Sequence, residues 1–136
     1  MHIAAWGPVN ENLWFTIPRD AAIARLGPAP KGPPNEPGPL AFSDRDYVLG
    51  ILSDAGFAAA AAEAVAVELT APNTPDAAGE LAVSVGPASR IISANKGTAD
   101  DTAVITAETT ADLMTYQTAS GILVPAVINL FSARNP

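Results

Sequence analysis

The sequence has no cysteine, one histidine and few basic residues, and these shortages exclude several functions. Without cysteine the chain has no disulfide, no thiolate nucleophile and no cysteine-ligated zinc. His2 alone does not make a metal centre, so no metal site is expected. Lys and Arg total 7 against 14 Asp and Glu, a formal net charge of −7. Because phosphate backbones are bound by clustered cations, this balance argues against a nucleic-acid partner. Solubility is the simpler role of the acidity.

Long apolar runs are also missing. No stretch reaches the length of about 20 residues that a membrane-spanning helix requires. The N-terminus lacks the basic segment and apolar run of a signal peptide. We therefore expect a cytoplasmic protein without a membrane partner. Its 136 residues form one domain at most, and the hydrophobic 49% of them are enough to form a core.

Two segments within the first 70 residues have the pattern of a strand. Residues 1–6 (MHIAAW) indicate a short buried strand that Gly7 and Pro8 end. Independent domains seldom begin inside a core strand, so this start predicts a truncated domain. Residues 62–70 alternate between apolar and polar positions, which predicts a second strand. The alanines at 58–62 are expected to be its connection.

The third strand is expected at residues 122–133 (ILVPAVINLFSA), which are apolar almost throughout. This composition is typical of a strand covered on both faces. Pro125 lacks an N–H group and therefore needs a bulge or a position near the strand's start. Within this chain the neighbours of a central strand can only be segments 1–6 and 62–70.

The clearest helix signal covers residues 44–55. Ser43 is the expected N-cap, and Phe42 with Tyr47 has the spacing of a hydrophobic staple. Gly56 suits the left-handed position after a helix. Phe57 is then expected to pack back on Leu52, as in a Schellman motif. Further helices are expected at 18–26 with Pro18 in the first turn, at 75–93 as two helices broken at Gly86-Pro87, and at 99–116 behind a Thr98 cap. Residues 27–39, rich in Pro and Gly, are expected to be a covering loop.

Three motifs together resemble the C-terminal half of a class I S-adenosylmethionine-dependent methyltransferase. MHIAAWGP…NLWF is similar to the end of the family's fifth strand and the segment after it. PGPLAFSDRDYVLGILSDAGF is similar to the run before strand six, and SGILVPAVINLFSARNP to the closing strand. The resemblance implies an α/β fold: part of a Rossmann-like sheet, with three strands, the last antiparallel and central, and flanking helices. It also implies methyl transfer to a small organic acceptor.

In that family the cofactor binds a Gly-rich turn after the first strand, and an acidic residue after strand two holds the ribose. No G-x-G-x-x-G turn follows a strand here. We therefore expect no cofactor-binding residue in this chain and no S-adenosylmethionine bound to it alone. The chain is expected to supply only the substrate side, with three origins open: a truncated reading frame, a split enzyme, or a non-catalytic binding or dimerisation module.

By resemblance, the residues that would line a substrate pocket are Trp6, Asn12, Trp14 and Phe15. The alternative is that the tryptophans belong to the core. Methyl transfer needs alignment more than a particular catalytic group, so no catalytic residue is assigned. Glu11 and His2 are the nearby ionisable groups, with solvated surface positions as the alternative. The edge of segment 1–6 has no lysine or proline that would block pairing, which predicts self-association or pairing with a missing N-terminal half.

Overall fold

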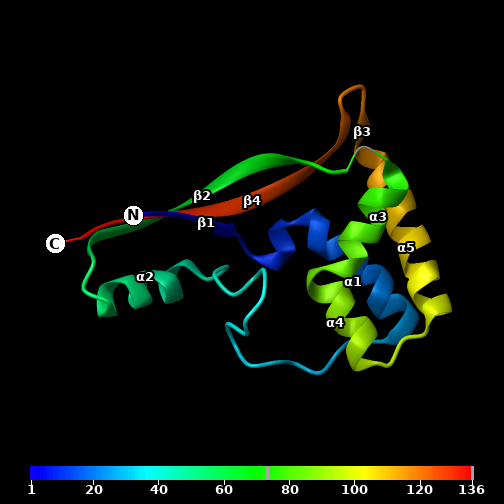
Figure 1. Ribbon diagram of the computed structural model, residues 1–136, viewed down its shortest axis with the longest axis horizontal. Helices are drawn as coiled ribbons and strands as arrows, with labels where there is room; N and C mark the ends of the chain where they lie inside the picture. Colours follow the sequence, from blue (N-terminus) through cyan, green and yellow to red (C-terminus); the bar gives the residue numbers. More distant parts are fainter. Residues whose placement is uncertain (73, 136) are drawn as a thin grey trace.

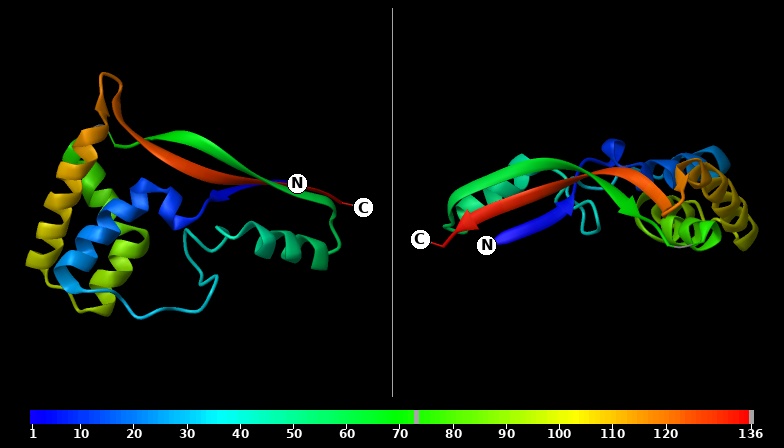
Figure 2. Two further views of the ribbon diagram at one scale, coloured as in Figure 1. Left: turned by 180° about the vertical axis from the view of Figure 1, so that it is seen from behind. Right: turned by 90° about the horizontal axis from the view of Figure 1, so that it is seen from above.

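An antiparallel sheet runs along the length of the molecule, and helices pack at its two ends (Figure 1). The computed structural model describes residues 1–72 and 74–135. Within them the fold is α/β, with five α-helices and an open sheet of four strands. The first and the last described residues lie at the same end of the sheet, beside helix α2 (Arg45–Asp54) (Figure 2). Pro136, the last residue of the closing motif, lies outside the described residues.

The strand order is β1-β4-β2, with the last strand central and antiparallel to both neighbours, as the sequence predicts. A fourth strand, β3, was not expected; it forms a hairpin with the start of β4. The strands are β1 (His2–Trp6), β2 (Ala58–Thr70), β3 (Gln117–Thr118) and β4 (Gly121–Arg134).

The expected connection at residues 58–62 is wrong, because these alanines are the first part of β2. Their register with β4 shifts between Ala58 and Ala61, and Ala59 has a positive φ of 52°. Alanine has a low intrinsic preference for strands, so composition does not indicate this segment. The long central strand offers ladder partners as far as Arg134, and this pairing extends β2 backward.

Pro125 lies at the fifth position of β4, in regular register with Glu68 and without a bulge. Of the two expected placements, the one near the strand's start is therefore correct. The backbone groups of even-numbered β4 residues bond to β2, as the Ile122 carbonyl does to the Ala71 amide. The backbone N–H and C=O groups of odd-numbered β4 residues therefore point toward β1. The β1 ladder ends at the bond between Gly7 and Val127. Pro125 lies beyond that end, so its missing N–H removes no ladder bond.

Helix α1 begins five residues earlier than predicted, at Leu13, with Asn12 as its N-cap. The prediction placed Pro18 in the first turn, where proline is favoured. Pro18 instead lies inside the helix and is buried. The five helices are α1 (Leu13–Leu26), α2 (Arg45–Asp54), α3 (Pro75–Ser84), α4 (Gly86–Ala94) and α5 (Ala99–Leu113); two 3₁₀ turns, η1 (Val9–Glu11) and η2 (Met114–Tyr116), precede α1 and follow α5.

The N-cap of α2 is Asp44 and not Ser43. The Asp44 carboxylate accepts from the amides of Asp46 and Tyr47 at 3.0 and 3.2 Å. This shift of one residue also removes the expected staple, and the side chains of Phe42 and Tyr47 are 40% and 41% exposed. Both residue types cap helices well, so the sequence alone does not separate them.

The C-terminal end of α2 is as predicted. Gly56 has φ 82°, and the Phe57 amide donates to the Leu52 carbonyl at 3.0 Å, which is the Schellman pattern. Phe57 packs against the buried group that contains Leu52. The predicted break between α3 and α4 is also confirmed, since Gly86 has φ 68°.

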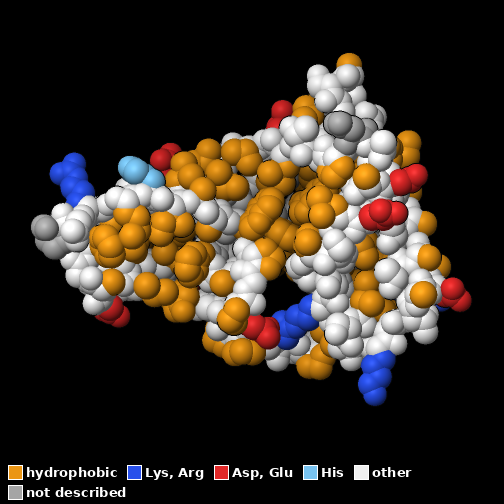
Figure 3. Space-filling view, in the orientation of Figure 1, with side chains coloured by type: hydrophobic (Ala, Val, Ile, Leu, Met, Phe, Trp, Pro, Cys, Tyr) orange, Lys and Arg blue, Asp and Glu red, His pale blue; other side chains and the backbone are white. Residues whose placement is uncertain are grey.

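Each face of the sheet is covered at only one end. Ile122 and Val124 of β4 are buried with α1 and α3, whereas Phe131 and Ala133 are buried with α2. Residues an odd number apart in a strand point to opposite faces, so the two helical groups contact opposite faces of β4. Because the long strands twist, both groups lie below the sheet in Figure 1. The uncovered parts leave apolar side chains on the surface, such as Leu130, which is 40% exposed (Figure 3).

Candidate functional site

The four residues expected to line a substrate pocket come together where the chain leaves β1 and enters α1. Trp6 ends β1, Asn12 is the N-cap of α1, and Trp14 and Phe15 belong to its first turn. The rings of Trp6 and Phe15 meet edge to face, with centroids 4.8 Å apart and an interplanar angle of 78°. Aromatic pairs favour this arrangement, so it fixes the end of β1 against α1.

The aromatic members of this group belong to the core. Phe15 is 1% exposed and Trp14 is 8% exposed, and both pack with Ile122 and Val124 of the central strand. Trp6 is half-buried against the same group. Gly86 is part of this packing, because a Cβ on it would lie 2.8 Å from the Phe15 ring. Trp6 alone therefore retains ring surface that a small molecule can reach.

Asn12 is completely buried, and both ends of its amide are bonded to backbone. Its Nδ2 donates to the Pro8 carbonyl at 2.9 Å, and its Oδ1 accepts from the Val127 amide at 3.1 Å. The Val127 carbonyl accepts from Gly7, the last bond of the β1 ladder. Oδ1 thus occupies the place of a strand carbonyl where β1 turns away from β4. Asn12 closes the ladder, and neither amide atom is free for a substrate.

A second buried asparagine, Asn129, was missed by sequence reasoning. Its Nδ2 donates to the carbonyls of Phe42 and Ser43 at 3.3 and 3.0 Å, and its Oδ1 accepts from Arg45 at 3.4 Å. A buried amide with such partners holds the start of α2 against the central strand. The available signal was a lone polar residue in an apolar strand, the Asn of VINLF.

A hollow of about 360 Å³ is lined by residues that these two asparagines bond, Pro8 by Asn12 and Ser43 by Asn129. It is lined by Pro8 from the end of β1 and by residues 43–46 at the start of α2. The side chains of this segment offer a hydroxyl, two carboxylates and the Arg45 guanidinium, which the bond to Asn129 holds in place. The hollow is thus a polar opening, and its residue Pro8 follows the half-buried Trp6 by two positions in the chain. Of the sequence-predicted residues it contains none, although Pro8 connects it to Asn12.

The two ionisable candidates are not brought together. Glu11 is exposed in η1, next to Asn12. His2 is exposed at the opposite end of β1 and pairs in register with Ser132. His2 and Trp6 lie four positions apart in the strand, a span of about 13 Å. The pair Asp100–Asp101 lies elsewhere, at the start of α5.

Helix capping explains Asp101. Its carboxylate accepts from the Thr98 amide and hydroxyl and from the Arg25 guanidinium at 2.7–3.0 Å. The Thr98 backbone and side-chain hydrogen bonds come first, and together with Arg25 they lower the pKa of Asp101 to about 2. The expected Thr98 cap is confirmed as a capping box. Among the described residues no group of three or more His, Asp or Glu side chains is placed to hold a metal ion.

The βα junction after β1 does not fit S-adenosylmethionine. A cofactor loop uses glycines so that its backbone can approach the ligand closely. Gly7 has a different use, because a Cβ there would lie 2.8 Å from the Val127 carbonyl oxygen, so the strand backbone fills that space. The junction after β2 begins with Ala71 and Pro72 and has no glycine before α3.

In the part of the chain that the structure describes, no helix is long and apolar enough to span a bilayer.

Searches with the sequence against protein-family models and against curated proteins return no match.

Proposed function

We propose that this chain is the substrate-side half of a class I S-adenosylmethionine-dependent methyltransferase that acts on a small organic acceptor. The observation that carries the proposal is the position of β4: the last strand lies between β1 and β2 and runs antiparallel to both. In the family that the three sequence motifs resemble, the last strand is inserted between strands five and six in this way. On this proposal β1 and β2 correspond to those two strands.

Coverage of the sheet supports the same proposal. In a complete Rossmann-like sheet both faces carry helices along their whole width. Here one face is covered by α2 at one end and the other face by α1 and α3 at the other end. The missing layers correspond to a cofactor half that would pair with β1. That half would carry the Gly-rich turn, which these residues do not provide.

The acceptor would approach at the end of β1, beside Trp6 and the hollow between Pro8 and the start of α2. In methyl transfer the methyl group passes in line from the sulfonium sulfur to the acceptor atom, so the protein mainly aligns the two. Asn12 and Asn129 serve this alignment indirectly. Each fixes the backbone of one wall of the hollow, at Pro8 and at Ser43, through bonds of 2.9 and 3.0 Å. Trp6 would contact an apolar part of the acceptor.

The test uses the coding sequence directly upstream of this chain. On the proposal it encodes a strand followed by a Gly-rich turn, in frame or as a separate polypeptide. The full protein or the co-expressed pair should bind S-adenosylmethionine in a calorimetric titration and transfer a labelled methyl group to a set of small phenols, amines and carboxylic acids. An assembled protein that binds no cofactor would contradict the proposal.

The second candidate is a non-catalytic binding or dimerisation module derived from the same fold. Its support is that Asn12, Trp14 and Phe15 are fully used in packing and ladder closure. An upstream sequence without a Gly-rich turn, together with a stable folded chain on its own, would favour this module.

A further inference from the structure

The outer edge of β1 has unpaired backbone groups whose positions follow from its bonds to β4. At one end the Met1 carbonyl accepts from the Ala133 amide at 3.1 Å, and at the other the Gly7 amide donates to Val127 at 2.9 Å. Hydrogen-bonded pairs of an antiparallel ladder recur at every second residue. The odd-numbered residues of β1 therefore bond to β4. The even-numbered residues direct their N–H and C=O groups to the free edge: His2, Ala4 and Trp6.

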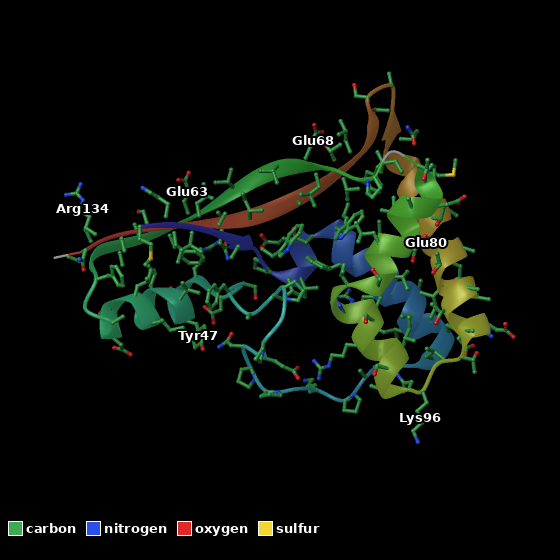
Figure 4. All side chains as sticks on the ribbon, in the orientation of Figure 1. Tyr47, Glu63, Glu68, Glu80, Lys96 and Arg134 are labelled. Atoms are coloured by element: carbon green, nitrogen blue, oxygen red, sulfur yellow. The ribbon has the colours of Figure 1, made fainter. Side chains whose placement is uncertain are left out.

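The two edges of this sheet differ in how they are protected. Along the outer edge of β2 the charged side chains of Glu63 and Glu68 stand out from the strand (Figure 4), and its first residues form an irregular register shift. Charges and bulges are the usual means by which proteins prevent edge-to-edge pairing. In β1, by contrast, the edge residues between Met1 and Pro8 include no Lys, Arg, Asp, Glu or proline. The β1 edge is thus the one that accepts another strand.

We propose that a second copy of this chain binds the β1 edge, with the two β1 strands antiparallel about a twofold axis at Ala4. In this register Ala4 lies opposite Ala4 of the second copy, and His2 lies opposite Trp6 of the second copy. The three open residues are then all paired, which gives about six hydrogen bonds between the chains. Because one set of groups satisfies an identical set, the interface closes as a dimer and does not continue into a filament.

The side chains near this edge suit such a dimer. Ala4 is small at the axis, where a large side chain would meet its own copy. The charge of −7 on each chain opposes association, and the β1 edge adds no acidic side chain to that repulsion. Exposed apolar side chains also gather at this end of the molecule (Figure 3), among them Met1 at 53% and Tyr47 and Ile51 of α2 at 41% each. The dimer is the state of this chain when no other strand pairs with β1. The cofactor half of the proposed function would occupy the same edge and displace the second copy.

The first experiment removes the open N–H at the axis. Ala4→Pro deletes this donor in both copies, whereas Ala64→Pro makes the same change on the other edge, since Ala64 is an even-numbered residue of β2 with an outward amide. Sedimentation velocity over a wide concentration range should show a dimer for the wild type and for Ala64→Pro. For Ala4→Pro the dissociation constant should rise at least tenfold, a change of ~1.4 kcal/mol. Circular dichroism melting checks that both variants fold.

The second experiment tests the register. Ala4→Lys places two cations opposite each other at the axis, and Ala4→Glu places two anions there, so each should weaken its own dimer by ~5–10-fold. A one-to-one mixture of the two variants should associate more tightly than either alone. A wild type that stays monomeric at all concentrations would overturn the proposal. A dimer weakened as much by Ala64→Pro as by Ala4→Pro would also overturn it, as would a mixture that gains nothing. None of these results depends on S-adenosylmethionine, so they leave the proposed function to its own test.

Discussion

Replacing Asn12 by alanine should destabilise the protein strongly, although the change removes no charge and little apolar surface. Asn12 is completely buried, and its Oδ1 is the acceptor for the Val127 amide. Without it that amide remains in the interior unpaired, which costs about 1–3 kcal/mol. The bond from Nδ2 to Pro8 contributes about 1 kcal/mol more. The Pro8 carbonyl itself keeps a partner, the Glu11 amide at 3.0 Å.

The expected loss is therefore about 3 kcal/mol in the free energy of unfolding. For a chain of this length that lowers the melting temperature by ~10 °C. The matched control is Asn95→Ala. Asn95 is half-buried, and its Nδ2 donates to the carbonyls of Gly27 and Ile91 at 3.2 and 3.0 Å. Water can replace this donor, so the control should lose about 1 kcal/mol or less.

Urea unfolding followed by circular dichroism measures both losses, and amide exchange adds a local measurement. In Asn12→Ala the Val127 amide should lose protection relative to Ile128, which bonds to β2. Asn12→Asp provides a pH test, because a carboxylate still accepts from Val127 but cannot donate to Pro8. Burial raises the folded-state pKa of that carboxyl, so its protonated form is favoured on folding. The penalty should be absent below a pH of about 4 and complete above the folded-state pKa. A loss below about 1 kcal/mol for Asn12→Ala would refute the ladder-closing role and return Asn12 to the substrate pocket.

Three further outcomes are expected. Phe57→Ala should lower the free energy of unfolding by about 2–3 kcal/mol in urea, because Phe57 packs against the buried group that contains Leu52 but is only partly buried. A loss below about 1 kcal/mol would mean that the ring contributes no packing. Hydrogen bonds from Thr98 and the Arg25 guanidinium hold the pKa of Asp101 near 2, so the contribution of Asp101 to stability is present above pH ~4 and is lost as the pH falls toward 2. A carbon-detected NMR titration should find this lowered pKa, and Thr98→Ala should raise the pKa of Asp101. The isolated chain should not bind S-adenosylmethionine in calorimetric titration, and low-micromolar binding would contradict the absence of a cofactor site.

Local signals predicted the parts of the fold that local forces determine. Gly56 with Phe57 ends α2, and Thr98 begins α5, because a cap depends on residues within one turn of each other. The central place of β4 was also predictable, since an apolar strand needs cover on both sides and only two other strand patterns were present.

The wrong predictions are those in which distant contacts decide. Pro18 marks a first turn by preference, but packing of Trp14 and Phe15 in the core begins α1 at Leu13. The alanines at 58–62 have no strand preference and become a strand only because β4 extends beside them. A propensity is worth less than 1 kcal/mol per residue, so tertiary pairing overrides it.

In the candidate site, too, local signals were predictable from the sequence and distant contacts were not. The resemblance to the methyltransferase family grouped Trp6, Asn12, Trp14 and Phe15 as residues of one pocket. The structure shows that proximity, but the partner of Asn12 is Val127, which is 115 residues away in the chain. The Oδ1 of Asn12 substitutes for a strand carbonyl at the point where β1 leaves β4. No motif in this sequence predicts that point.

Asn12 and Asn129 together explain how a sheet with half of each face uncovered keeps a defined end. Both are completely buried, and the amide nitrogen of each donates to backbone carbonyls, of Pro8 for Asn12 and of Phe42 and Ser43 for Asn129. A purely apolar residue at either position would leave the Val127 amide, or the Phe42 and Ser43 carbonyls, without these partners. The walls of the hollow at Pro8 and Ser43 are thus positioned by two buried asparagine side chains, one at the start of α1 and one in β4. If the proposed function is correct, this rigidity is what a methyl acceptor requires, because a reaction that depends on alignment loses rate when its binding walls move by as little as about 1 Å.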